Sequence, residues 1–195
     1  MSTTIKNLIA SFLGESQARN RYTFWASIAR KEGFEQVAEI FTITAEQEKK
    51  HGKTFYEFAL KLNKESATPT KIDLHMDMEV HVLMGTTAEN LKAAVAGEHE
   101  EASLLYPKFA DEAEAEGYPE IAAKFRAIAL AEEHHQQNYE KLLALVESGT
   151  FFKGRGVQTW SCRECGYMVV GEEAPKICPS CDHPQGFFEK LQNEY

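Results

Sequence analysis

The sequence has no long apolar run and no dense basic run, and each absence excludes a class of protein. No apolar stretch approaches the roughly 18 residues that a membrane-spanning helix needs. Lys and Arg number 21 against 30 Asp and Glu, a formal net charge of -9, and the basic residues do not gather into a stretch that could follow a phosphate backbone. The N-terminal residues lack the pattern of an export signal. We therefore expect a cytoplasmic protein that binds neither membrane nor nucleic acid.

Cysteine is scarce, and all four cysteines form two Cys-x-x-Cys pairs near the C-terminus. The first pair is Cys162 and Cys165, the second is Cys178 and Cys181, and twelve residues separate the pairs. In a reducing compartment this usage indicates metal binding sooner than disulfides, and the spacing suits one tetrahedral four-sulfur site. The ligands alone allow structural zinc or redox iron, and a redox disulfide is a distant third interpretation. A small domain needs such a metal for its stability in either case.

Apolar residues recur at helical spacing over four long stretches, which predicts a mainly α protein built on a four-helix bundle. Thr86 and Glu89 have the spacing of a capping box at the start of the third stretch. Pro107 should bend that helix, because proline has no amide donor. The four expected helices span about residues 5–31, 35–62, 86–117 and 119–148.

The connection between the second and third helices is too long for a tight hairpin, so it should cross the bundle. Within it, residues 72–82 alternate strictly between apolar and charged side chains, which indicates an extended segment. We hypothesise that this segment pairs as a strand with its counterpart in a second subunit.

The helical pattern of the sequence ends near residue 154, and short segments interrupted by glycine and proline follow. This change predicts a bundle domain over residues 1–149, a linker over 150–156 and a small cysteine domain over 157–195.

An internal repeat divides the expected bundle into two copies of one helical hairpin. Residues 32–51 align with residues 116–135 at a constant offset of 84. Gly14-Glu15 reappears as Gly97-Glu98 at an offset of 83.

Several glutamates fall on helix faces that ought to be buried. Glu15 stands three residues after Phe12 and seven before Tyr22, and Glu48 and Glu98 have similar apolar neighbours at helical spacing. Burying several unpaired carboxylates would cost more than the roughly 5 to 15 kcal/mol of a domain's net stability. Inward-facing Lys and Arg are too few to neutralise them, so we infer metal ions. The alternative interpretation is that these acids are solvated surface charges.

Glu-x-x-His motifs occur at residues 48–51 and 132–135, in repeat register, and each places a carboxylate and an imidazole on one helix face. Two such motifs, with one glutamate from each of two other helices, form the arrangement of di-iron and di-manganese carboxylate proteins. Glu101 adds a carboxylate where the first repeat has Ala18, so the site should be asymmetric.

At these residues the chain resembles the rubrerythrin family, which joins a ferritin-like di-iron bundle to a rubredoxin-like iron domain. The resemblance covers nearly the whole chain. It is carried in the bundle by residues 14–22, 48–51, 98–101, 106–107 and 132–135, and in the cysteine domain by the Trp-x-Cys-x-x-Cys-Gly-Tyr motif at 160–167 and the Cys-Pro-x-Cys-x-His-Pro-x-x-Phe-Phe-Glu motif at 178–189.

The resemblance implies a di-iron peroxidase that reduces hydrogen peroxide to water. Its electrons would come from NAD(P)H, through rubredoxin or an NAD(P)H-dependent reductase. The four-cysteine site would bind iron and not zinc. Ferritin-like bundles often dimerise, so we expect a homodimer or a higher oligomer. One alternative is a ferroxidase or iron-handling protein on the same bundle, and another is a structural or binding module with zinc at the cysteines.

The resemblance also implies roles for individual residues. Glu48 and Glu132 would bridge the irons, and His51 would exchange with Glu101 as a ligand when the pair is reduced. Tyr22 and Tyr106 resemble tyrosines that hydrogen-bond ligand carboxylates, although bundle cores also use tyrosine for packing. We expect His75, His81, His99 and His134 at the surface. The implied iron ligands of the bundle are Glu15, Glu48, His51, Glu98, Glu101, Glu132 and His135.

Overall fold

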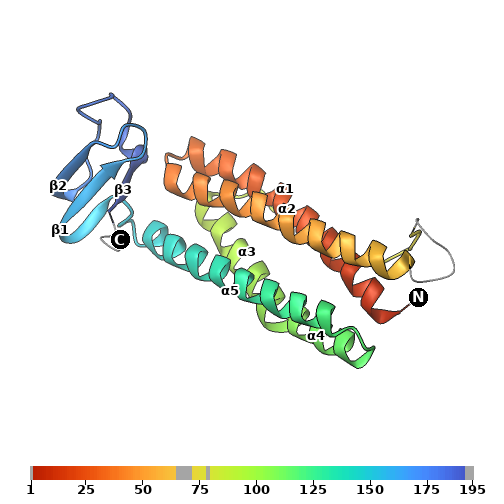
Figure 1. Ribbon diagram of the computed structural model, residues 1–195. Helices are drawn as coiled ribbons and strands as arrows, with labels where there is room; N and C mark the ends of the chain where they lie inside the picture. The colour runs from red at the N-terminus through yellow and green to blue at the C-terminus, as the bar shows by residue number, and fades with distance from the viewer. Residues whose placement is uncertain (1, 65–71, 78–79, 192–195) are drawn as a thin grey trace.

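Two helical hairpins and a small antiparallel sheet make up the protein, as a computed structural model that describes residues 2–64, 72–77 and 80–191 shows (Figure 1). None of the helices in these described ranges is long and apolar enough to cross a membrane. The helical elements are α1 (Thr3–Lys31), α2 (Glu35–Lys64), α3 (Thr87–Glu100), the π-helical turn η1 (Glu101–Leu105), α4 (Tyr106–Ala115) and α5 (Pro119–Glu147).

The first hairpin, α1 and α2, and the second, α3 to α5, turn in the same way. Gly33 has φ +82° and Gly117 has φ +85°, a left-handed conformation that side chains disfavour and that glycine adopts after a helix C-terminus. The Thr86 side chain and the Glu89 carboxylate form the expected capping box at the start of α3. The two turns are therefore equivalent in structure as well as in sequence.

The bend expected at Pro107 takes the form of the π-helical turn η1. The N–H of Tyr106 donates to the carbonyl of Glu101, five residues earlier. In a regular α-helix the ring of Pro107 would clash with the carbonyl of Ser103, four residues before it. The wider turn relieves that clash directly ahead of the proline.

The repeat offsets locate one extra residue in the same place. Glu15 and Glu98 differ by 83 positions, whereas Tyr22 and Tyr106 differ by 84, so the second hairpin has gained one residue between its glutamate and its tyrosine. Tyr22 follows Glu15 by 7 residues, two α-helical turns, and Tyr106 follows Glu98 by 8. Because η1 absorbs the additional residue, both tyrosines face the interior and are only 1% exposed.

Two apolar clusters fill the bundle and leave a polar section between them. One contains Ala18 of α1 and Ala45 of α2, and the other contains Leu8 of α1 and Phe55 of α2. Glu15 and Glu48 fall between these positions on their helices. The apolar clusters on either side therefore separate the middle of the bundle from solvent at its ends.

The crossover between α2 and α3 forms neither helix nor strand in its described part, residues 72–77 and 80–86. Its apolar side chains at 72, 74 and 76 are half-buried and the polar ones between them are exposed, so the alternation in sequence corresponds to an alternation in burial over residues 72–77. Val80 and Val82, farther along the segment, are exposed. The indole Nε1 of Trp25 donates to the carbonyl of Leu83 at 3.0 Å and fixes the crossover on α1. Met78 and Glu79 lie outside the described residues, and strand pairing with a second subunit stays a prediction.

The C-terminal domain is a three-stranded antiparallel sheet in the order β2-β1-β3. Strand β1 begins at Lys153, inside the stretch expected to be a linker. Trp160 and Phe188 are fully buried and form the core of this domain together with Cys162 and Cys178. Its elements are β1 (Lys153–Cys162), β2 (Met168–Glu173), the 3-10 turn η2 (Gln185–Phe187) and β3 (Phe188–Lys190).

The sheet domain packs against the end of the bundle where α1 and α2 meet (Figure 1). Arg163, between the first two cysteines, forms ion pairs with Glu39 of α2 and with Glu189 of β3. The ring of Phe34 stacks against that of Phe152 with centroids 5.9 Å apart. Gly186 of η2 lies directly against the backbone of Gly33.

We predict that Gly186→Ala weakens this packing, because a Cβ at residue 186 would lie 2.5 Å from the carbonyl oxygen of Gly33. The free energy of unfolding, measured by urea denaturation of the metal-loaded protein, should fall by about 1 to 3 kcal/mol. Gly156→Ala is the control, since a Cβ there meets no atom within 4 Å. Equal stability of the two variants would contradict the packing described.

Candidate metal centres

The middle of the bundle contains four buried glutamates, one from each long helical segment. Glu15 of α1, Glu48 of α2, Glu98 of α3 and Glu132 of α5 are each at most 1% exposed. Two histidines, one turn after Glu48 and Glu132 on the same helix faces, complete two groups whose ligand atoms lie within 4.8 Å of one another. One group is Glu15, Glu48, His51 and Glu132, and the other is Glu48, Glu98, Glu132 and His135.

Glu48 and Glu132 belong to both groups, and each directs one oxygen to each group. Oε2 of Glu48 lies 3.0 Å from Nδ1 of His51, and its Oε1 lies 3.2 Å from Nδ1 of His135. Oε1 of Glu132 lies 2.8 Å from Nδ1 of His51, and its Oε2 lies 2.8 Å from Nδ1 of His135. This geometry fits two cations side by side that share two carboxylates.

Many of these atoms are buried and lack a hydrogen-bond partner among the described residues. A buried polar atom without a partner costs about 1 to 3 kcal/mol, and more when it is charged. Carboxylate oxygens and imidazole nitrogens are also the ligands that iron and manganese accept. The donor set therefore fits a pair of metal ions. The unpartnered atoms of this group are Glu15 Oε2, Glu48 Oε1, Glu98 Oε2, Glu132 Oε1 and Oε2, and His135 Nδ1.

Two tyrosines hold the glutamates that are not shared. The hydroxyl of Tyr106 donates to Oε1 of Glu15 at 2.5 Å, and the hydroxyl of Tyr22 donates to Oε1 of Glu98. In both glutamates the other oxygen, Oε2, is the unpartnered one. Each tyrosine thus orients a carboxylate so that one oxygen remains free for a metal.

Gln47 is a part of the site that sequence reasoning missed. Nε2 of His135 lies 3.0 Å from the side-chain oxygen Oε1 of Gln47. An Nε2–H that donates to this amide leaves the lone pair of Nδ1 for a metal. In the sequence Gln47 is notable only because it directly precedes a ligand glutamate. That position alone does not mark a neutral residue as part of a metal site.

Glu101 lies outside both groups, at the edge of the site. It is half-buried in η1, and its Oε1 would lie 3.6 Å from a Cβ placed on Gly14 of α1. Burial and the neighbouring carboxylates of Glu98, Glu132 and Glu48 raise its pKa well above the usual value. The expected asymmetry is thus visible as a fifth carboxylate beside the four central ones.

Burial and mutual contacts shift the pKa values of the ligand residues in the absence of cations. Burial raises the pKa of Glu98 to about 8, and it also raises that of Glu15 well above its usual range. Burial opposes charge on His51, but the nearby carboxylates of Glu132 and Glu48 outweigh burial and raise the pKa of His51 to about 9. Burial likewise opposes charge on Glu48, yet contacts with His135 and His51 lower the pKa of this carboxyl to about 2.

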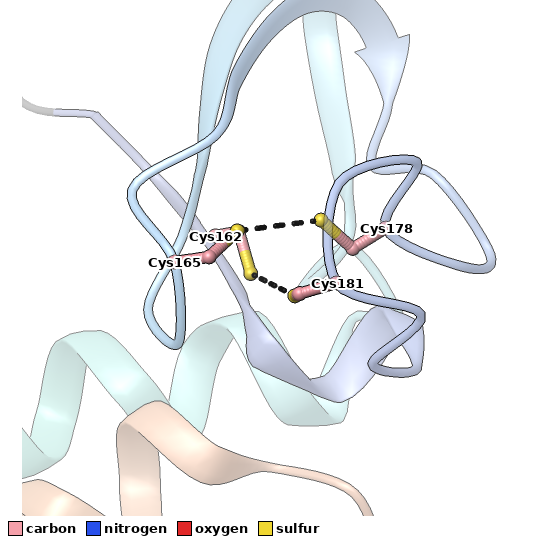
Figure 2. Close-up of side chains that lie close together, drawn as sticks. All are labelled: Cys162, Cys165, Cys178 and Cys181. Carbon is pink, nitrogen blue, oxygen red and sulfur yellow. Dashed lines mark hydrogen bonds between the residues drawn. The ribbon is translucent and has the colours of Figure 1, made fainter.

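The four cysteines meet at a second candidate centre, and Figure 2 shows their side chains converging. The Sγ atoms of Cys162 and Cys181 are 3.8 Å apart, and those of Cys165 and Cys178 are 3.7 Å apart. A tetrahedral ion with metal–sulfur bonds of about 2.3 Å requires sulfur separations of about 3.8 Å. The four thiols are therefore already placed for one metal ion.

The two Cys-x-x-Cys loops have the same backbone hydrogen bonds. The amide of Cys162 donates to the carbonyl of Tyr167, and the amide of Cys178 donates to that of His183, both at 2.8 Å. A backbone hydrogen bond at Tyr167 lowers the pKa of Cys165 to about 6, which favours the thiolate that metals bind. The loops thus prepare the geometry of all four ligands, and the first loop also favours the thiolate of Cys165.

The remaining histidines that the sequence assigned to the surface belong to neither metal group of the described residues. Their side chains are exposed, and His99 and His134 point to other faces of α3 and α5 than the ligands that precede or follow them. The four residues are His75, His81, His99 and His134.

Comparison with known proteins covers both domains. The protein-family model of rubrerythrin matches residues 6–143, and that of the rubrerythrin rubredoxin-like domain matches residues 160–189. A protein of Methanocaldococcus jannaschii described as a putative rubrerythrin is 49% identical over 195 residues, which cover 100% of this chain and 96% of that protein. Both halves of the chain therefore match one family.

Solved structures support the same fold. The fully reduced, all-ferrous state of nigerythrin matches with a TM-score of 0.64 at 28% identity, covering 98% of this chain and 88% of that one. A bacterioferritin of Desulfovibrio desulfuricans matches with a TM-score of 0.63 at 16% identity, covering 74% of this chain and 80% of that chain, which shows the ferritin-like fold of the bundle. The predicted fold class is confirmed.

These matches, together with the converging ligands, give the chain a di-iron site in its bundle and a four-cysteine site in its rubredoxin-like domain. The chain belongs to the rubrerythrin family, whose members are di-iron proteins of oxidative stress defence.

Proposed function

We propose that this protein is a peroxidase that reduces hydrogen peroxide to water in the cytoplasm. The observation that carries the proposal is the double sharing of Glu48 and Glu132 between two adjacent ligand groups. Two ferrous ions bound there supply together the two electrons that convert one hydrogen peroxide and two protons into two water molecules. A site for a single ion could supply only one of these electrons at a time.

The residues of the bundle have separate roles in this proposal. Glu48 and Glu132 would each bind both ions, while His51 and His135 would each supply one imidazole ligand. Tyr22 and Tyr106 orient Glu98 and Glu15 through the hydrogen bonds described above. Glu101 stands beside this set as the carboxylate that would exchange with His51 as a ligand.

The cysteine domain would relay electrons to the bundle, and its four sulfurs would hold one iron. The ion pair between Arg163 and Glu39 supports this role, because it fixes the loop of the first two cysteines on α2. Glu48 follows Glu39 on that helix by nine residues, about 14 Å along the axis at 1.5 Å per residue. We propose rubredoxin or an NAD(P)H-dependent reductase as the electron donor and a homodimer or higher oligomer as the working assembly.

Anaerobically reduced protein should be oxidised by one equivalent of hydrogen peroxide per di-iron pair, much faster than by dioxygen. Stopped-flow absorbance with each oxidant measures both the stoichiometry and the rate. Glu132→Gln should lose this reaction together with bound iron, since it removes a shared ligand. Glu133→Gln is the matched control, because Glu133 is the adjacent exposed residue. Faster oxidation by dioxygen would instead favour a ferroxidase.

Metal analysis should find one iron per four cysteines, besides two in the bundle. Cys178→Ser removes one of the converging sulfurs and should abolish the visible absorption of the iron–thiolate site, while the two bundle irons remain as an internal control. Stoichiometric zinc in place of iron at the cysteines would refute the electron relay.

The metal-free protein should lose stability as the pH rises, partly through Glu98. Its folded pKa of about 8 lies above the ordinary value of 4.5 for a glutamate, so its contribution is fully present below about pH 4.5 and is lost as pH rises through 8. Glu98→Gln, which stays neutral, should match the native chain at about pH 4 and exceed its free energy of unfolding by about 3 to 5 kcal/mol at pH 9. Urea denaturation of metal-free protein measures this difference. Glu100→Gln, at an exposed neighbour, should show no such pH dependence.

A further inference from the structure

A hollow of about 280 Å³ lies between α1 and the α3–η1 segment and reaches the edge of the bundle site. Its lining includes Glu101 and also Tyr106, whose hydroxyl donates to Glu15. One water occupies about 30 Å³ of liquid, so the hollow can admit several molecules of that size. The hollow thus connects solvent with residues at the di-iron site.

Two glycines keep this hollow free of side chains. Gly14 of α1 and Gly97 of α3 are repeat equivalents, each directly precedes a ligand glutamate, and both line the hollow. Glycine inside a helix costs about 1 kcal/mol relative to alanine. Neither has a positive φ, so backbone conformation does not require glycine at these positions. A Cβ at Gly97 meets no atom within 4 Å, so helix packing does not require it there either.

A buried hydroxyl without a partner lines the same hollow. Ser11 is only 4% exposed, and its Oγ has no hydrogen-bond partner among the described residues. Burying a hydroxyl without a partner costs free energy that a small polar molecule in the hollow would recover. This second observation points to a polar occupant and is independent of the glycines.

The crossover forms the outer wall. His81 of the crossover and Arg21 of α1 both line this hollow. They also line a neighbouring hollow of about 420 Å³, together with Trp25 and Leu83. The hydrogen bond from Trp25 to the Leu83 carbonyl holds that wall in place. The long connection between the hairpins therefore shapes the opening on this face of the bundle.

We propose that this hollow is the route by which hydrogen peroxide reaches the Glu101 side of the di-iron site, with Gly14 and Gly97 keeping it open and Ser11 offering a hydrogen bond to the incoming molecule. The proposal rests on the peroxidase function proposed above. It assigns to the two glycines and the serine a role in substrate access and none in metal binding.

The test fills the hollow without touching a ligand. Gly97→Leu adds a side chain where a Cβ has free space, and Ala10→Leu, at another residue of the lining, is a second variant in case the first fails to fold or to bind iron. Ala123→Leu places the same side chain on an exposed position of α5, outside the hollow, and serves as control. Iron content and melting temperature are measured first for all variants.

Two rates are then compared. The first is the second-order rate of oxidation of the reduced protein by hydrogen peroxide, and the second is the association rate of azide with the di-ferric protein, which needs no turnover. Both should fall by about tenfold or more in the filled variants at unchanged iron content, and remain native in the control. Ser11→Ala should slow oxidation by peroxide and should not lower the melting temperature, because it removes a buried hydroxyl without a partner.

The outcomes separate the two proposals. The proposed route would be wrong if filled variants that retain their iron reacted with azide and with peroxide at the rates of the native protein. The native chain could be inert towards peroxide while azide still associates more slowly with the filled variants. The peroxidase function would then be wrong, and the hollow would remain the access route for small ligands.

Discussion

The structure depends on the need to neutralise several carboxylates buried in the middle of a helical bundle. Four glutamates that are at most 1% exposed converge on two histidines, and most of their inward oxygens have no partner in the described chain. Such a group is costly without cations, so binding of metal and stability of the bundle are coupled. The two apolar clusters and the tyrosine hydrogen bonds can be understood as the surroundings that hold these charges in place.

The bundle is nearly symmetric, and its departures from symmetry lie on one face. The glutamates, the histidines and the tyrosines occur in pairs related by the internal repeat. Glu101 has no counterpart, and it lies in η1, the turn that contains the additional residue. The hollow opens at the same place. One side of the metal pair therefore differs from the other in its ligands, its helix geometry and its exposure to solvent.

Much of this could be predicted from the sequence, because a helix has a fixed period. Spacing alone indicated the four helices, the inward faces of Glu15, Glu48 and Glu98, and the convergence of four cysteines. The failures concern contacts between elements that no local pattern specifies. Gln47 is recognisable only once His135 is seen beside it, and the bend expected at Pro107 did not specify that Glu101 would lie in a π turn. The packing of the sheet domain on α2 likewise rests on Arg163 and Gly186, whose partners are distant in sequence.

The π turn also records the history of the chain. If the two hairpins descend from one duplicated ancestor, they have come to differ by one residue at this point, since α1 runs through the equivalent stretch as a regular helix. Removing it now would rotate Tyr106 by about 100° relative to Glu98 and take its hydroxyl away from Glu15. A deletion at this point would therefore break the hydrogen bond that orients Glu15, so the different helix geometry of the two hairpins is tied to the geometry of the metal site.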